Sequence, residues 1–142
     1  MVDISLKKLP QPVQHSHSLL LTGSCFTEHI GRSLLEMKFQ VLQNPHGILF
    51  DPVSVCNSLV DYIGCREYNK DDIFFFQELW HSWRHHSRFS GVDPDEVLEG
   101  MNRSVVEAHQ FLQDADWLII TLGSSYSYRL QDDIPAKAAT LK

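Results

Sequence analysis

The sequence lacks any long apolar segment and contains few cysteines. No stretch of the 142 residues reaches the ~18 apolar residues that a membrane-spanning helix needs. The segment 1–18 has no apolar run, so we do not expect a signal peptide. The three cysteines, Cys25, Cys56 and Cys65, form neither a CxxC pair nor a zinc knuckle. We therefore expect a cytoplasmic protein with reduced thiols.

Basic residues are also scarce. The chain has 12 Lys and Arg against 18 Asp and Glu, which gives a formal net charge of −6. Binding to nucleic acid or to anionic lipid needs clustered Lys and Arg, so we expect neither a nucleic-acid nor a membrane partner. Hydrophobic residues make up 43% of the sequence, enough for the core of one domain. The oligomeric state stays open.

Three short apolar segments have the pattern of strands. The run Ser18–Thr22 ends at Gly23-Ser24, which predicts a buried parallel strand followed by a tight turn. The segment Phe39–Gln43 predicts a second strand, and the run 117–122, which ends at Gly123, predicts a third. Residues 68–90 predict a strand or an irregular packed loop, in which we expect Phe74–Phe76 to belong to the core.

Apolar residues at helical spacing predict three helices between these strands. The first covers about 26–37, and its apolar stripe consists of Phe26, Ile30, Leu34 and Met37. Asp51-Pro52 predicts the start of the second, which ends near Gly64. Asp93-Pro94 starts the third, with Glu96 placed to close a capping box. The apolar stripe of the second helix consists of Val55, Leu59, Tyr62 and Ile63, and the apolar face of the third consists of Val97, Met101, Val105, Ala108 and Leu112.

Strands that alternate with helices predict an α/β fold with a parallel sheet covered on both faces. The carboxyl ends of such strands meet at one edge, where ligand sites lie. Two predicted strand ends carry hydroxyl residues beside glycine, at Thr22–Ser24 and at Thr121–Ser125. A serine at such a turn is either exposed next to the unpaired N–H groups of the following helix or simply caps that helix.

Four segments of the chain resemble the GSCFA family. They are LLLTGSCFTEHIG at 19–31, NPHGILFDP at 44–52, HHSRFSG at 85–91 and ITLGSSYSYR at 120–129. The resemblance implies a three-layer, flavodoxin-like parallel sheet similar to that of SGNH hydrolases and incomplete at its C-terminus. We expect an extended lead-in at 1–16, a partial GSCFA domain at 17–130 and a polar tail at 131–142.

The resemblance also implies an activity, hydrolysis of an ester or acyl bond in a small-molecule substrate without a cofactor. Ser24 matches the nucleophile, and its N–H, Gly47, Ser124 and Ser125 match the oxyanion hole. Ser125 stands where SGNH hydrolases have asparagine, and Asn44 is an alternative donor. The Asp-x-x-His pair that supplies the base does not occur after residue 129, and no histidine follows His109. We therefore expect a truncated product with little activity of its own.

A non-catalytic module that binds a carbohydrate or acyl ligand, or an inactive truncated product, is the alternative. Four residues are candidates for lining the pocket in either case, namely Asn44, His46, His86 and Gly123. His85 is expected to be a packed or surface residue. His81, His85 and His86 have no acidic or cysteine partner arranged with them, so we expect no metal site. Cys25 is expected to pack under the first turn.

Overall fold

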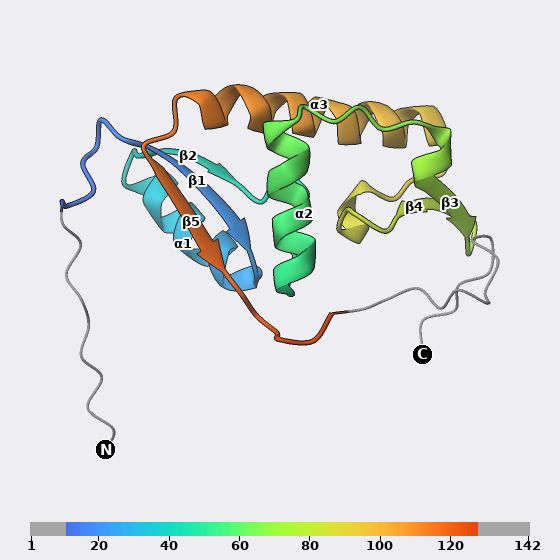
Figure 1. Cartoon of the computed structure of the whole chain (residues 1–142), viewed down its shortest axis with the longest axis horizontal. Helices are drawn as coiled ribbons and strands as arrows, with labels where there is room; N and C mark the ends of the chain where they lie inside the picture. The colour runs from blue at the N-terminus through green and yellow to red at the C-terminus, as the bar shows by residue number, and fades with distance from the viewer. Residues whose placement is uncertain (1–10, 128–142) are drawn as a thin grey trace, which may run out of the picture.

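The computed structural model describes residues 11–127, and within them it has an α/β fold (Figure 1). Three parallel strands form one sheet in the order β2-β1-β5. The strands are β1 (Ser18–Gly23), β2 (Gln40–Gln43) and β5 (Trp117–Thr121), and the helices are α1 (Cys25–Glu36), α2 (Pro52–Ile63) and α3 (Pro94–Gln113). The α/β class is thereby confirmed, whereas the three-layer SGNH-like arrangement stays a prediction. The expected tail at 131–142 lies outside the described residues.

Helices cover both faces of the sheet. Leu20 of β1 packs in a buried cluster with Tyr62 of α2 and Ala108 of α3, and Leu42 of β2 lies against the same cluster. Side chains alternate between the faces of a strand, so Gln43 points the other way. Its side chain meets Gly31 of α1, where an added Cβ would lie 2.0 Å from Gln43 Oε1. α1 therefore covers one face, and α2 with α3 covers the other.

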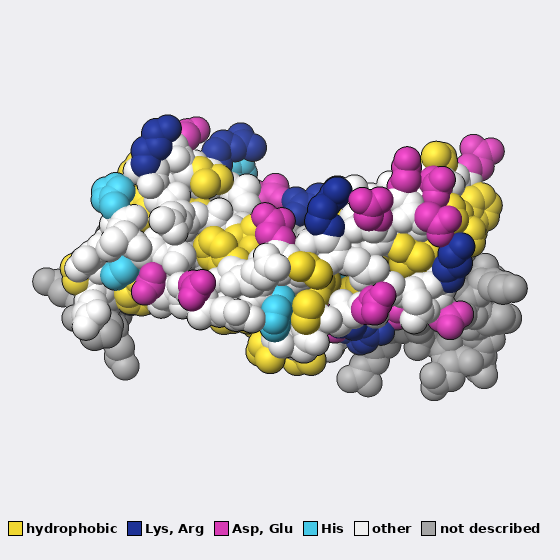
Figure 2. Space-filling model, turned by 90° about the horizontal axis from the view of Figure 1, so that it is seen from above, with side chains coloured by type: hydrophobic (Ala, Val, Ile, Leu, Met, Phe, Trp, Pro, Cys, Tyr) yellow, Lys and Arg dark blue, Asp and Glu magenta, His cyan; other side chains and the backbone are white. Residues whose placement is uncertain are grey.

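The third helix, α3, spans both halves of the molecule (Figure 1). Its start is fixed by Asp93, whose side chain accepts hydrogen bonds from the N–H groups of Asp95 and Glu96. The buried face of α3 consists of Val97, Met101, Val105 and Ala108, as the sequence predicts. Figure 2 shows acidic and basic side chains interspersed over the molecule on the side of α3. None of the described helices combines the length and apolar character needed to cross a membrane.

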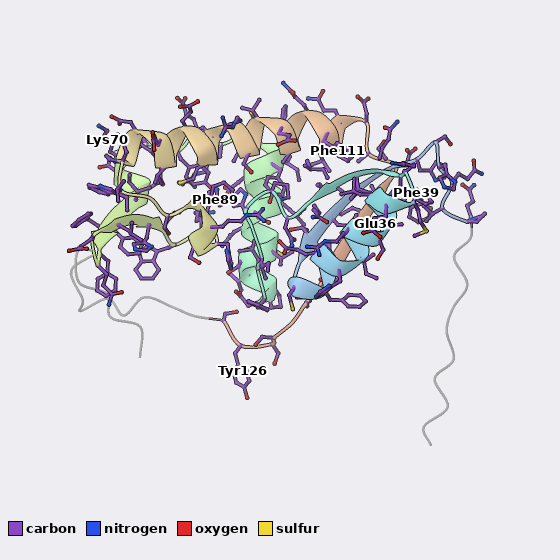
Figure 3. The ribbon with its side chains drawn as sticks, turned by 180° about the vertical axis from the view of Figure 1, so that it is seen from behind. Glu36, Phe39, Lys70, Phe89, Phe111 and Tyr126 are labelled. Carbon is purple, nitrogen blue, oxygen red and sulfur yellow. The ribbon has the colours of Figure 1, made fainter. Side chains whose placement is uncertain are left out.

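The segment 68–90 forms a small antiparallel hairpin under α3. Its strands are β3 (Ile73–Phe76) and β4 (Leu79–Ser82), flanked by the 3₁₀ turns η1 (Lys70–Asp72) and η2 (Ser87–Phe89). Tyr68 and Ile73 join Val97, Met101 and Val105 of α3 in one buried cluster, with Phe89 packed against it (Figure 3). Phe75 and Phe76 are exposed, so their predicted core position is wrong. Phe75 and Phe76 stand at the turn end of the hairpin, whereas Ile73 at the other end of β3 is the residue of this strand that packs in the cluster with α3.

The first helix has its predicted extent but a different orientation. Phe26, Ile30 and Met37 of the predicted apolar stripe are exposed, and the buried residues of α1 are Thr27 and Gly31. Thr27 Oγ1 is hydrogen-bonded to Thr121 Oγ1, and Gly31 lies against Gln43. Small side chains face the sheet because α1 approaches it too closely for larger ones. Cys25 is exposed as well, so the prediction that it packs under the turn is wrong.

The two neighbouring valines of α3 test the assignment of its buried face. Val105 is 0% exposed and Val106 is 44% exposed. Val105→Ala should lower the free energy of unfolding by about 2 kcal/mol, because buried methyl groups are lost. Val106→Ala should be neutral or slightly stabilising, because alanine favours a helix. Denaturant unfolding of both variants measures the difference, and equal effects would contradict the packing described.

Candidate active site

The carboxyl ends of β1 and β5 come into direct backbone contact at Gly23. This glycine has a φ of 134°, and a Cβ added to it would lie 1.9 Å from the carbonyl oxygen of Thr121. Only glycine adopts this conformation readily and leaves room for the neighbouring carbonyl group. The contact places Ser24, the next residue, at the end of β5 as well as at the start of α1.

The side chain of Ser24 does not cap α1, although Ser24 occupies the N-cap position. It makes no capping hydrogen bond, and its Oγ lies 2.9 Å from Thr121 Oγ1 instead. The capping interpretation of this serine is therefore wrong. The expectation of an exposed serine is also wrong, because Ser24 is only 6% exposed. Its hydroxyl is held in a narrow space at the edge of the sheet.

Thr121 orients the hydroxyl group of Ser24. Its Oγ1 accepts a hydrogen bond from the N–H of Ser24 at 3.1 Å and is hydrogen-bonded to the hydroxyls of Ser24 and Thr27. A hydroxyl has one proton and two lone pairs, so these three contacts saturate Thr121. Thr121 is not among the site residues predicted from the sequence. The signal that could have identified it is a hydroxyl residue at the end of a predicted strand, two residues before Gly123.

The expected oxyanion donors already have acceptors. The N–H of Ser24 donates to Thr121 O at 2.9 Å, that of Gly47 to Asn44 O at 2.8 Å, and that of Ser124 to Phe50 O at 3.0 Å. Their oxyanion role, and that of Ser125, stays a prediction. By contrast, the N–H groups of Cys25 and Phe26 have no acceptor among residues 11–127. These amides lie at the positive end of the α1 dipole.

Gly123 and Asn44 lie beside the Ser24 turn, while their role in lining a pocket stays a prediction. A Cβ added to Gly123 would lie 3.1 Å from Ser24 Cβ and 2.8 Å from Phe50 Cδ1. Asn44 is fully buried, and its Oδ1 accepts a hydrogen bond from the N–H of Gly23 at 2.9 Å. The Nδ2 of Asn44 has no partner among the described residues. Asn44 thus holds the backbone just before the candidate nucleophile.

The loop 44–47 is fixed by side chains from several elements. The guanidinium of Arg88 donates to the carbonyl of Asn44 and pairs with Glu28 of α1 at 3.2 Å. Ser104 of α3 donates to the carbonyl of Pro45. The N–H of His46 donates to the hydroxyl of Tyr62 at 3.0 Å. The loop is buried, and its backbone is satisfied without belonging to a strand or helix.

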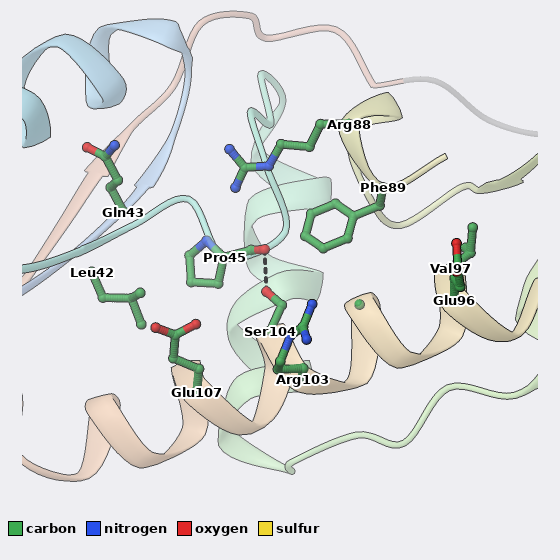
Figure 4. Close-up of a pocket in the computed structure, with 11 residues that line it drawn as sticks. Leu42, Gln43, Pro45, Arg88, Phe89, Glu96, Val97, Arg103, Ser104 and Glu107 are labelled. Carbon is green, nitrogen blue, oxygen red and sulfur yellow. Dashed lines mark hydrogen bonds between the residues drawn. The ribbon is translucent and has the colours of Figure 1, made fainter. Parts of the chain in front are cut away.

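Two hollows border this region. A groove of about 420 Å³ lies between the loop at Pro45, η2 and α3, with Arg88, Arg103, Glu96 and Glu107 in its walls (Figure 4). Ser24 does not line this groove. The other hollow, of about 290 Å³, is lined by Phe50 and Ser124, which adjoin Gly123 and therefore Ser24. The second hollow is thus the one next to the candidate nucleophile.

Comparison with protein families agrees with the resemblance in the sequence. A family model described as the GSCFA family matches residues 18–140. The chain belongs to the GSCFA family. No curated protein and no solved structure matches it. In this GSCFA protein, Ser24 is the single residue between the end of β1 at Gly23 and the start of α1 at Cys25.

His46 of the GSCFA protein turns away from Ser24 into a buried polar cluster. Its Nε2 lies 3.1 Å from the hydroxyl of Tyr68, which in turn donates to Asp61 Oδ2 at 2.6 Å. Since the Tyr68 proton goes to Asp61, the Nε2 of His46 donates to the Tyr68 oxygen. The ring of His85 stacks on that of His46 at 3.9 Å. Arg84 closes the cluster through a 3.0 Å ion pair with Asp61.

The charges of this cluster are set by its burial. Burial alone raises the pKa of Asp61, but the contacts with His46 and Tyr68 and the charge of Arg84 outweigh it and lower the pKa to about 2. Burial lowers the pKa of His85 to about 2, and it also lowers the pKa of His46. Both imidazoles are therefore neutral at pH 7, while Asp61 is ionised. No pattern in the sequence predicted this cluster, and its one local signal is Asp61, an aspartate within an apolar helix.

The other histidines do not gather around a metal. His86 caps η2, where its Nδ1 accepts from the N–H of Arg88 at 3.2 Å, and it packs against Gly47. His81 is hydrogen-bonded to Ser90 at 2.8 Å, while His85 is buried against His46. Within residues 11–127, no group of three or more metal-binding side chains is arranged for a metal ion.

The buried histidines predict a loss of stability in mild acid. Their unfolded pKa is 6.5 and the folded pKa is lower, so below pH 6.5 the unfolded chain binds protons that the folded chain does not. The free energy of unfolding should fall by up to about 1.4 kcal/mol per pH unit for each histidine. In His85→Phe, the free energy of unfolding should fall less between pH 8 and mild acid than it does in the unchanged protein, each protein being compared with its own value at pH 8. Urea unfolding across pH measures it, and an unchanged slope would contradict the buried neutral state.

Removing the central carboxylate of the cluster should be costly. Asp61→Asn removes a buried carboxylate that accepts a hydrogen bond from Tyr68 and pairs with Arg84, whose side chain is 36% exposed, and we expect a loss of about 1–3 kcal/mol in the free energy of unfolding. The matched control is Asp95→Asn, which removes only an exposed 3.0 Å ion pair with Lys70 and should cost less than about 1 kcal/mol. Thermal and denaturant unfolding compare the two. Similar losses would show that Asp61 is no more important than a surface carboxylate.

Proposed function

We propose that this GSCFA protein is an SGNH-like serine hydrolase that acts on ester or acyl bonds, with Ser24 as its nucleophile. The observation that supports this most is the hydroxyl of Ser24, which occupies an N-cap position without capping the helix. It is oriented by Thr121 at the edge of a parallel sheet. Such edges are where ligands bind in α/β folds.

The proposed reaction proceeds through an acyl-enzyme. Ser24 Oγ attacks the carbonyl carbon while its proton passes to a base, and the carbonyl oxygen becomes negatively charged. The free N–H groups of Cys25 and Phe26 are placed to stabilise that charge at the start of α1. The intermediate then expels the alcohol, which takes a proton, and water releases the acid from Ser24 in a second, equivalent step.

The base is the part of this mechanism that the described residues do not supply. No histidine, aspartate or glutamate among residues 11–127 is hydrogen-bonded to Ser24 Oγ, whose partner is Thr121. The Asp-x-x-His pair of SGNH hydrolases is also missing from the 142 residues. A serine without a base is a poor nucleophile at neutral pH. We therefore expect slow reaction unless a base is added.

Imidazole in solution should substitute for the missing base. We predict that a fluorophosphonate probe labels Ser24 slowly, and that added imidazole accelerates this labelling in proportion to its concentration, by less than the ~10²-fold that a positioned side-chain base contributes. Thr121→Val should weaken the acceleration, because the Ser24 hydroxyl loses its orienting partner. Mass spectrometry of the labelled peptide identifies the modified residue.

Two controls separate this outcome from general reactivity. Ser24→Ala should abolish the labelling, whereas Ser33→Ala, which changes an exposed serine of the same helix, should leave it unchanged. If imidazole accelerates labelling at other serines equally, Ser24 is not a nucleophile and the hydrolase proposal is wrong.

A second proposal is a binding module that uses the same edge without catalysis. It is favoured by the backbone acceptors that already occupy the N–H groups of Ser24, Gly47 and Ser124. In this case a carbohydrate or acyl ligand binds equally well to the protein and to Ser24→Ala, and imidazole has no effect on labelling. We also propose a cytoplasmic location, since three exposed cysteines without disulfides suit a reducing compartment.

A further inference from the structure

We propose that the hollow beside Ser24 binds a single neutral aliphatic acyl chain. Its volume of about 290 Å³ lies at the small end of ligand pockets, which suits one chain better than a ring system. The apolar part of its wall consists of Ile48, Leu49, Phe50 and Tyr126. Binding of the chain does not depend on the hydrolase proposal, whereas any reaction at its carbonyl group does.

The walls of the hollow are tied to the strand ends on both sides of Ser24. The N–H of Leu49 donates to Gly23 O at 2.9 Å, which joins the wall to the end of β1. The N–H groups of Gly123 and Ser124 donate to Phe50 O at 2.9 and 3.0 Å, which joins it to the segment after β5. Phe50 and Ser24 flank Gly123 directly. A chain in the hollow therefore has its end next to the Ser24 turn.

Two polar side chains of the wall, Asp51 and Ser124, already make hydrogen bonds within the protein. The carboxylate of Asp51 accepts hydrogen bonds from the N–H groups of Val53 and Ser54, which cap α2. The hydroxyl of Ser124 accepts from the N–H of Tyr126 at 3.0 Å. A hydrocarbon chain needs no donor or acceptor from this wall, so the groups that are already engaged do not oppose its binding.

The charge of the wall favours a neutral ligand. Although burial raises the pKa of Asp51, hydrogen bonds from Ser54 outweigh it and lower the pKa, so the carboxylate is ionised at neutral pH. A fatty acid anion would meet a like charge here, while an ester or another uncharged acyl compound would not. The class of ligand is therefore an aliphatic ester rather than a free carboxylate.

Methyl ketones of increasing chain length test the proposal, because they resemble esters but cannot be hydrolysed. Binding of butanone, hexanone and octanone to the full chain is followed by NMR through the methyl signals of Ile48 and Leu49. We expect affinity to rise about fourfold for each added methylene until the hollow is filled. Octanoate should bind more weakly than octanone because of Asp51.

Variants decide whether the hollow is the site. Phe50→Ala should weaken octanone binding by about tenfold. Ile48→Ser is a second variant that should also weaken octanone binding, and it keeps the test valid if Phe50→Ala disturbs the fold. Phe75→Ala is the matched control, since Phe75 of β3 is a similarly exposed phenylalanine (53% against 48%) outside the hollow. Affinity that does not depend on chain length, or that falls equally in Phe75→Ala, would overturn the acyl-chain proposal.

The result is independent of the hydrolase test. Octanone binding without labelling of Ser24 would retain the acyl-chain site and reject the hydrolase. Labelling of Ser24 without chain-length-dependent binding would retain the hydrolase and reject the acyl-chain site.

Discussion

The contact between the backbone of Gly23 and that of Thr121 determines the geometry of the candidate site. It brings the end of β1, the start of α1 and the end of β5 to one point, because only a glycine fits between them. Ser24 follows at once, and its hydroxyl is hydrogen-bonded to Thr121 instead of capping the helix. The side chain that orients the candidate nucleophile therefore comes from the last strand of the sheet, 97 residues away in the sequence.

A second group of contacts, the buried cluster around Asp61, fixes the loop that lies beside the Ser24 turn. The cluster around Asp61 connects α2 with the segments that carry Tyr68 and His85, and it contains the side chain of His46. The same residue, through its backbone, belongs to the loop beside the Ser24 turn. Burial keeps the imidazoles of His46 and His85 neutral. The ionised carboxylate of Asp61 therefore pairs with Arg84, and the two histidines add no positive charge to the cluster. Fold stability and the position of the loop thus depend on the same group of residues.

The sequence predicted features that depend on local patterns. The Asp-Pro pairs at 51–52 and 93–94 predicted the starts of α2 and α3, since each aspartate accepts hydrogen bonds from the first turn of its own helix. Helical spacing also identified the buried face of α3. The apolar run 18–22 located Ser24 at the first strand end, where the structure has it.

Features that depend on strand register or on close packing were not predicted. The pairing of Ser24 with Thr121 requires that β1 and β5 lie side by side in a particular register. The orientation of α1 follows from Thr27 and Gly31, whose small size matters only once the sheet is in place. The role of Asp61 depends on partners from three separate segments. Each of these requires tertiary contacts, and local periodicity contains no information about them.

The loop 44–47 has a consequence for how tightly a ligand can be held. Arg88, Ser104 and Tyr62 fix its backbone from three different elements. A loop that is already ordered loses little conformational entropy when a molecule settles against it, so more of the contact energy remains as affinity. Flexible binding loops lose conformational entropy when they bind a ligand. At this edge of the GSCFA domain, that loss has already occurred during folding.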